Sequence, residues 1–139
     1  MFRRILIPTD LTDRTIRAIH VARDVQAPHD SRLMLLHVIE TVTGAEFEEL
    51  SSFYGTLEKQ AWNRLHDIAT RASVPHAQID AHVVFGKRVE ETLKFARVHQ
   101  VELIVLASHP IDPVAPASSI GTMSYKLGIL APCAVLLVK

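Results

Sequence analysis

Short apolar runs alternate with longer amphipathic stretches along this chain, and the alternation predicts an α/β fold. Five runs are rich in Ile, Leu and Val, as expected of strands that are buried on both faces of a parallel sheet. They cover 4–8, 33–39, 79–85, 103–107 and 134–138. The run 79–85 alternates with polar residues more than the others, which favours an edge position. We therefore expect an open five-stranded parallel sheet with helices on both faces.

The first stretch between these runs predicts a helix over 13–25, with Thr12 or Asp13 as its N-cap. Its buried stripe is predicted to be Thr15, Ala18, Ile19 and Ala22. A longer helix follows the second strand. Its apolar positions at helical spacing are Leu50, Phe53, Tyr54, Leu57, Ala61, Leu65, Ile68 and Ala72.

Two further helices are expected in the second half of the chain. One covers 87–99, after the glycine that ends the third strand. The other covers about 119–130, after a Pro-rich loop at 110–116. Their inward positions are predicted to be Val89, Leu93 and Ala96 in the first, and Met123, Leu127 and Leu130 in the second.

Composition favours a single cytoplasmic domain over 1–139. The 139 residues, 48% of them hydrophobic, suffice for a core without metal or disulfide support. Equal numbers of basic and acidic residues, 15 each, argue against nucleic-acid or membrane-surface partners. The chain start lacks a signal-peptide pattern, and no apolar run is long enough to span a membrane. Cys133, the only cysteine, fits a reducing compartment and is expected to pack as a small hydrophobe.

A ligand site is expected at the carboxyl ends of the strands, because open parallel sheets bind ligands where the strand order reverses. If the first strand is central, the crevice lies between Asp10 and the segment 107–110. The helix start near Thr122 would direct free N–H groups to the same crevice, as in phosphate sites. Asp10 has two interpretations, a contact to a ribose hydroxyl or an ordinary turn into the following helix.

Two histidines and the common sequence motifs of enzymes bear on whether the chain catalyses a reaction. His37, inside the second strand, is interpreted as a satisfied core histidine, whereas His109 is either a solvated loop residue or a ligand contact. An enzyme would use Asp10 with His109 as an acid–base or metal pair. However, the chain carries no dinucleotide-binding fingerprint, phosphate loop, nucleophile elbow or zinc spacing. We therefore expect no catalytic residue and no bound metal.

Several segments, in order and across nearly the whole chain, resemble the universal stress protein family. The segments that carry the resemblance are 5–10, 35–39, 84–86, 103–109, 121–124 and 131–138. The resemblance implies a Rossmann-like sheet, related to adenine nucleotide alpha hydrolases, with strand order 3-2-1-4-5 and two helices on each face. It also implies a stress-response regulatory protein.

The resemblance further implies a set of nucleotide-binding positions. By motif they are Pro8, Thr9, Asp10, Val38, Leu106, Ala107, Ser108, His109, Gly121, Thr122, Met123 and Ser124. The family's phosphate loop has the form G-x-x-G, a spacer and G-[ST], but Ala107 and Pro110 replace its first two glycines and the spacer is longer. Pro110 lacks an N–H and has a fixed φ, so we expect weak ATP binding. ATP or AMP with Mg²⁺, another adenine compound, and no nucleotide all remain open.

A homodimer through the last strand is the final expectation. The resemblance suggests it, and a short apolar strand at a sheet edge leaves backbone groups unpaired, which a second copy would satisfy. The residues concerned are Ala134, Val135, Leu136, Leu137 and Val138. The alternative is an edge covered by the terminal helix. Two roles follow, a dimer that contacts a regulatory protein partner through the loop 110–116, or a nucleotide-binding switch.

Overall fold

The computed structural model describes residues 1–41, 47–72, 79–108, 114 and 122–139. Five parallel strands form a sheet in the order β3-β2-β1-β4-β5, which confirms the predicted order and the edge position of the third strand. The strands are β1 (Arg4–Pro8), β2 (Arg32–Glu40), β3 (Ile79–Gly86), β4 (Leu103–Ala107) and β5 (Ala134–Val138). The helices are α1 (Arg14–Val25), α2 (Ser51–Arg71), α3 (Arg88–Val98) and α4 (Met123–Leu130), and a 3-10 turn, η1 (Phe47–Leu50), precedes α2.

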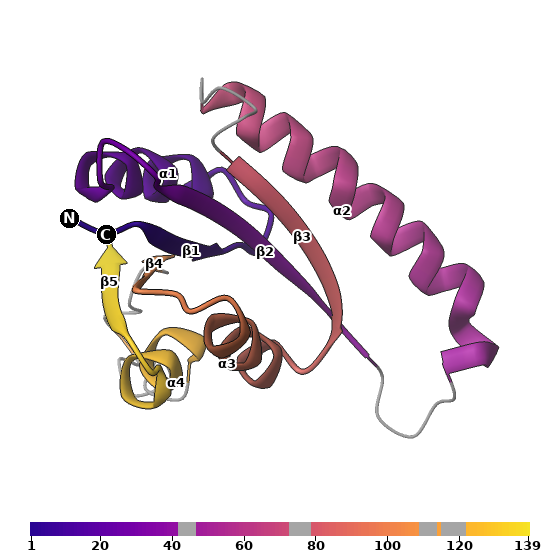
Figure 1. The fold of residues 1–139 in the computed structure, drawn as a ribbon. Helices are drawn as coiled ribbons and strands as arrows, with labels where there is room; N and C mark the ends of the chain where they lie inside the picture. Colours follow the sequence, from indigo (N-terminus) through magenta and orange to yellow (C-terminus); the bar gives the residue numbers. More distant parts are fainter. Residues whose placement is uncertain (42–46, 73–78, 109–113, 115–121) are drawn as a thin grey trace.

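Alternate residues of the central strand β1 anchor two separate core layers. Ile5 and Ile7 pack with α1 and α2 on one face of the sheet. Leu6 packs with α3 and α4 on the other. Figure 1 shows the two pairs of helices on opposite sides of the sheet. Successive side chains of a strand point to opposite faces of the sheet. A central strand that is covered by helices on both faces therefore needs apolar residues at every position.

The stripe predicted for α1 is confirmed, because Thr15, Ala18, Ile19 and Ala22 are its buried residues. The side-chain cap predicted for the start of α1 is not observed. Asp13 occupies the N-cap position but makes no side-chain cap hydrogen bond. Its carboxylate instead accepts hydrogen bonds from Arg64 and Arg71 of α2, each at 2.7 Å. A pair of guanidinium groups from another helix has therefore displaced the local capping bond.

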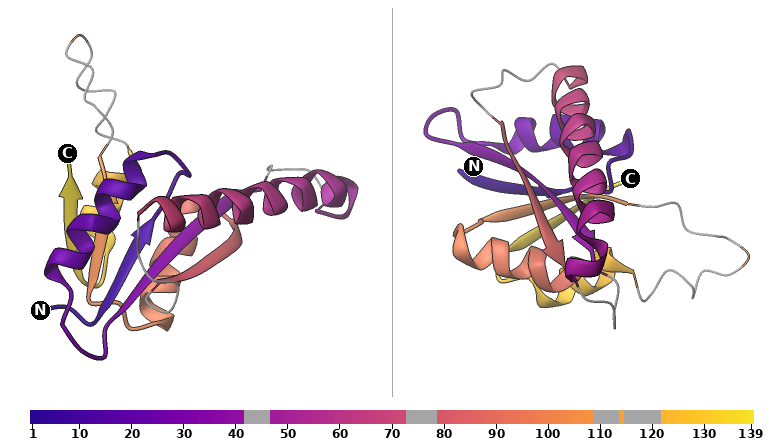
Figure 2. Two further views of the ribbon diagram at one scale, coloured as in Figure 1. Left: turned by 90° about the horizontal axis from the view of Figure 1, so that it is seen from above. Right: turned by 90° about the vertical axis from the view of Figure 1, so that its right-hand side faces the viewer.

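The long helix α2 is only partly buried. Tyr54, Ala61, Leu65 and Ile68 face the sheet, but Phe53 is 53% exposed, contrary to the sequence prediction. Figure 2 shows α2 as a long helix whose start reaches the side of the molecule. The adjacent Tyr54 is 2% exposed and packs with Ile39 and Phe85, so Phe53 is exposed because of its position around the helix. Trp62, on the outer side of α2, is 42% exposed.

The inward faces predicted for α3 and α4 need two corrections. In α3 the buried residues are Thr92, Phe95 and Ala96, while Val89 and Leu93 pack only partly against the core. In α4 Leu127 is fully buried, but Leu130 is 57% exposed because it ends a helix of 8 residues. None of the helices in the described part of the chain is both long and apolar enough to cross a membrane.

Candidate functional site

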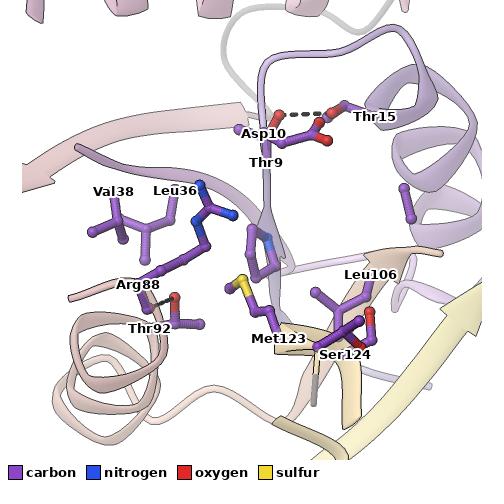
Figure 3. Close-up of a pocket in the computed structure, with 13 residues that line it drawn as sticks. Thr9, Asp10, Thr15, Leu36, Val38, Arg88, Thr92, Leu106, Met123 and Ser124 are labelled. Carbon is purple, nitrogen blue, oxygen red and sulfur yellow. Dashed lines mark hydrogen bonds between the residues drawn. The ribbon is translucent and has the colours of Figure 1, made fainter. Parts of the chain in front are cut away.

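A cavity of about 280 Å³ lies beyond the carboxyl ends of β1, β2 and β4, where α3 and α4 begin. Its walls come from the strands β1, β2 and β4 and from the helices α1, α3 and α4 (Figure 3). The lining residues are Pro8, Thr9, Asp10, Thr15, Leu36, Val38, Arg88, Thr92, Leu106, Ala107, Thr122, Met123 and Ser124. The crevice expected from the strand order is therefore a real cavity.

Nine of the positions predicted from the sequence line this cavity together. They are Pro8, Thr9, Asp10, Val38, Leu106, Ala107, Thr122, Met123 and Ser124. Ser108 does not belong to the lining residues, and its backbone N–H donates to the carbonyl of Val138 at 2.8 Å. His109 and Gly121 lie outside the described residues, as does most of the loop 110–116.

The turn after β1 is held by a small network of hydrogen bonds around Thr9. The Thr9 hydroxyl oxygen accepts the N–H of Leu11 at 2.9 Å and lies 2.6 Å from the hydroxyl of Thr15. The Thr9 carbonyl lies 2.9 Å from Nδ1 of His37, so the half-buried His37 has a partner in this turn. Leu11 has a φ of 66°, a left-handed conformation that an ordinary side chain adopts only when its surroundings enforce it.

A clamp from α2 reinforces the same turn. Nε of Arg64 donates to the carbonyl of Leu11 at 2.9 Å, while another nitrogen of the same guanidinium binds Asp13. Hydrogen bonds from Arg71 and Arg64 lower the pKa of Asp13 from 3.8 to about 2. Two arginines therefore join the long helix to the segment that carries Asp10.

Asp10 lies at the mouth of the cavity as an ionised carboxylate. Its Oδ1 accepts hydrogen bonds from the N–H of Thr12 at 3.0 Å and from the Thr12 hydroxyl at 2.6 Å. Oδ2 lies 3.4 Å from Arg14. Partial burial acts to raise the pKa of Asp10, but the bonds from Thr12 and Arg14 outweigh it, so the pKa lies below its ordinary value. Asp10 forms the turn and also lines the cavity, and its contact to a ribose hydroxyl stays a prediction.

The backbone of Val38 presents a peptide edge to the cavity. Pairing of β1 with β2 ends at Pro8 and Leu36, while β2 continues alongside β3 as far as Glu40. The Leu36 carbonyl accepts the N–H of Thr9, and in a parallel strand residues two apart direct their N–H and C=O groups to the same side. Val38 therefore points one donor and one acceptor to a side on which no described strand pairs with it.

Two helices begin at the cavity. Thr122, in extended conformation, is the N-cap of α4, and its side chain makes no cap hydrogen bond. The first N–H groups of a helix have no partner within the helix and carry partial positive charge. Because Met123 and Ser124 also line the cavity, this end suits an anionic group.

Sequence reasoning missed two residues of α3, Arg88 and Thr92. Thr92 is fully buried, and its hydroxyl donates to the Arg88 carbonyl at 2.7 Å. A signal existed for each. Thr92 is a threonine within an apolar stripe, and such a residue needs a polar partner. Arg88 is a basic residue in the first turn of a helix, although the helix dipole favours a cation in the last turn.

No group of three metal-binding side chains gathers within the part of the chain that the structure describes. Cys133 is half-buried against the α3 and α4 layer. Burial raises the pKa of its thiol, and a backbone hydrogen bond at Ile104 offsets this only in part. Cys133 therefore has the packing environment expected of a small hydrophobe and little thiolate character.

The sheet, its flanking helices and the cavity at the strand ends define a Rossmann-like α/β protein. The model of the universal stress protein family matches residues 1–139. This chain belongs to the universal stress protein family. A universal stress protein of Thermus aquaticus is 30% identical over 143 residues, and universal stress protein YxiE of Bacillus subtilis is 24% identical over 149, with all of both chains covered in each case.

Solved structures of the family share the fold. UspA from Lactobacillus plantarum has a TM-score of 0.77 at 22% identity, covering 99% of this chain and 98% of its own. A universal stress protein in complex with cAMP has a TM-score of 0.67 at 18% identity, covering 99% and 97%. One from Archaeoglobus fulgidus in complex with dAMP has a TM-score of 0.65 at 12% identity, covering 99% and 98%.

Proposed function

We propose that this protein binds a purine nucleoside monophosphate in the cavity and acts as a regulatory binding protein, not as an enzyme. The observation that carries the proposal is the pairing of two features in one cavity, the peptide edge of Val38 and the start of α4. The first suits the edge of a flat base and the second suits a phosphate. Family members solved with cAMP and dAMP support a ligand of this class.

Each part of such a ligand has a partner. The phosphate would take N–H groups at the start of α4 and the hydroxyls of Thr122 and Ser124. The ribose hydroxyls would donate to the carboxylate of Asp10, which is ionised near neutral pH. The base would lie against Val38 and Leu36, which supply apolar surface and the free peptide edge.

One phosphate suits this site better than three. Ala107 adds a methyl group where a glycine would allow close approach, and Pro110 has no N–H to offer. Each lost bond to a charged acceptor is worth about 1.5–3 kcal/mol. Asp10 is the only carboxylate among the described lining residues, so the protein supplies little for Mg²⁺. We therefore propose a monophosphate bound without Mg²⁺ rather than Mg-ATP.

The test is thermal unfolding of the purified protein with increasing AMP, ADP, ATP and adenosine, each with and without Mg²⁺. A ligand that binds only the folded state raises the unfolding midpoint. At a ligand concentration of about a hundred times Kd, the free energy of unfolding rises by about 2.7 kcal/mol. We expect the largest shift with the monophosphate, no effect of Mg²⁺, and a smaller shift in Asp10→Ala and Ser124→Ala. Asp24→Ala, outside the cavity, is the matched control. Absence of any shift would refute the proposal.

A second proposal concerns assembly. We propose a homodimer through β5, the edge strand, in which a second copy pairs with the free backbone edge. Leu137 is 43% exposed on the face of the sheet that carries α4, so α4 does not cover this edge in full. The helix that precedes β5, α4, also carries three exposed apolar side chains, Tyr125, Ile129 and Leu130. Nucleotide binding at the start of α4 would then bear on the dimer and on any regulatory partner.

A further inference from the structure

Arg88 of the cavity wall has most of its hydrogen-bond donors unengaged within the described residues. Its recorded side-chain contact within the described residues is one ion pair, in which Nε lies 3.8 Å from Oε1 of Glu40. Both side chains are substantially exposed, and an ion pair this long in such a setting holds its partners weakly. A guanidinium carries five N–H donors in a planar fork. Arg88 therefore faces the cavity with donors to offer.

Arg88 stands at the end of the cavity where the base would lie. Figure 3 shows its side chain extending from α3 toward Val38 and Leu36, whereas Ser124 lies on the other side of the cavity. Arg88 and Val38 also form a common wall with a neighbouring groove of about 520 Å³ beneath α2. A ligand with its phosphate at α4 would bring its base to Val38 and Arg88.

The peptide edge of Val38 does not by itself distinguish the purines. One N–H and one C=O match N1 and the 6-amino group of adenine. Guanine presents O6 and N1–H in the reverse order, and the same edge accepts it when the base is turned over or shifted along the strand. A guanidinium does distinguish them, since it only donates. Guanine offers it two adjacent acceptors, O6 and N7, whereas adenine offers N7 beside an amino group that is itself a donor.

We infer that Arg88 sets the base preference of this cavity toward a purine with a 6-oxo group, guanine or hypoxanthine, over adenine. This inference rests on the proposed monophosphate site and adds the identity of the base. On binding, the guanidinium of Arg88 leaves Glu40 and donates to O6 and N7. Glu40 is thus a competitor of the ligand for Arg88.

The test compares GMP, IMP and AMP by titration calorimetry on the wild-type protein, Arg88→Met, Arg88→Lys and Arg97→Met. The expected preference for GMP and IMP over AMP is about 5- to 150-fold in the wild type, the range for a bidentate arginine contact to guanine. Arg88→Met, which keeps the length but no donor, should abolish the preference, because GMP and IMP lose two hydrogen bonds where AMP loses at most one. Arg88→Lys should keep only part of it, because lysine lacks the fork. Arg97→Met, on the same helix, is the control.

The outcomes separate the two proposals. If AMP binds as tightly as GMP in the wild type, or if Arg88→Met weakens all three ligands equally, the inference is wrong and the monophosphate site stands. If none of the three binds, both are wrong. Glu40→Gln gives an independent measurement, because removal of the competing carboxylate should tighten GMP binding, and weaker GMP binding would contradict the exchange of partners.

Discussion

The hydroxyl oxygens of Thr9 and Thr15 lie 2.6 Å apart and join the end of β1 to the first turn of α1. The Thr9 oxygen also accepts the N–H of Leu11, so one hydroxyl joins both the turn and the helix. Both threonines are buried and line the cavity. The bridge therefore stabilises the fold and shapes the site through the same atoms.

Replacement of Thr15 by Val should destabilise the protein by about 1–3 kcal/mol, because the buried Thr9 hydroxyl loses its hydrogen-bond partner on α1. Urea unfolding measures the change in the free energy of unfolding. Thr70→Val is the matched control, since the exposed Thr70 hydroxyl donates to a helix carbonyl on α2 and its loss should cost less than about 0.5 kcal/mol. Equal losses in the two variants would contradict the role of the bridge.

Acid should destabilise the clamp between α1 and α2. The pKa of Asp13 falls from 3.8 to about 2 in the folded protein, so its ionised form stabilises the fold at pH values above 3.8. This contribution is lost as the pH falls from 3.8 toward 2. Asp13→Asn should be less stable than the wild type near neutral pH and show a shallower decline in urea midpoint across this acid range.

Asp24→Asn provides the comparison for that pH series, since Asp24 of α1 has no ion pair recorded in the described residues. Its urea midpoints should run parallel to those of the wild type. If Asp13→Asn runs parallel as well, the clamp contributes nothing to the stability of the folded state.

Two glycines should respond to alanine in opposite directions. Gly86 ends β3 with a φ of +147°, and a Cβ there would lie 2.7 Å from Cγ of Glu91, so Gly86→Ala should lose more than about 1 kcal/mol. Gly55 lies within α2 with nothing within 4 Å of a Cβ, so Gly55→Ala should gain about 0.5–1 kcal/mol from helix propensity. Denaturant midpoints of both variants check the pair, and equal signs would refute the assignment of strain to Gly86.

Charge at the β5 edge should disrupt the proposed dimer. Leu137→Arg places a cation on the exposed apolar side of this strand, where burial against a second copy would strip its hydration. Sedimentation velocity should show a dimer for the wild type and a monomer for this variant. Val98→Arg, at another exposed apolar position, should remain dimeric. A monomeric wild type, or dissociation of both variants, would contradict the β5 interface.

The strands could be predicted from the sequence because burial on both faces leaves runs of apolar residues with little interruption. β1, β4 and β5 have the expected bounds, β2 is longer by one residue at each end, and β3 is longer by one residue at its carboxyl end. The stripe of α1 was equally predictable, since α1 packs on the sheet along its length. Strand order came from the family resemblance, as periodicity does not specify which strands are neighbours.

The features that could not be predicted depend on contacts between distant segments. The carboxylate of Asp13 binds Arg71 rather than its own helix, and the two are 58 positions apart. Phe53 has helical spacing, but the neighbouring Tyr54 makes the contact with β2 and β3 and leaves Phe53 on the exposed side of α2. Arg88 reaches the cavity only because α3 begins beside the end of β2, which the spacing of 87–99 does not reveal.

The exposure of Trp62 on the outer side of α2 has a spectroscopic consequence. It is the only tryptophan of the chain and is absent from the cavity wall, so its fluorescence reports on the seating of α2 and not on the occupied state of the site. Emission that stays constant during a nucleotide titration is therefore compatible with full binding. The same signal during unfolding will register the release of the long helix, which makes it a probe of one core layer.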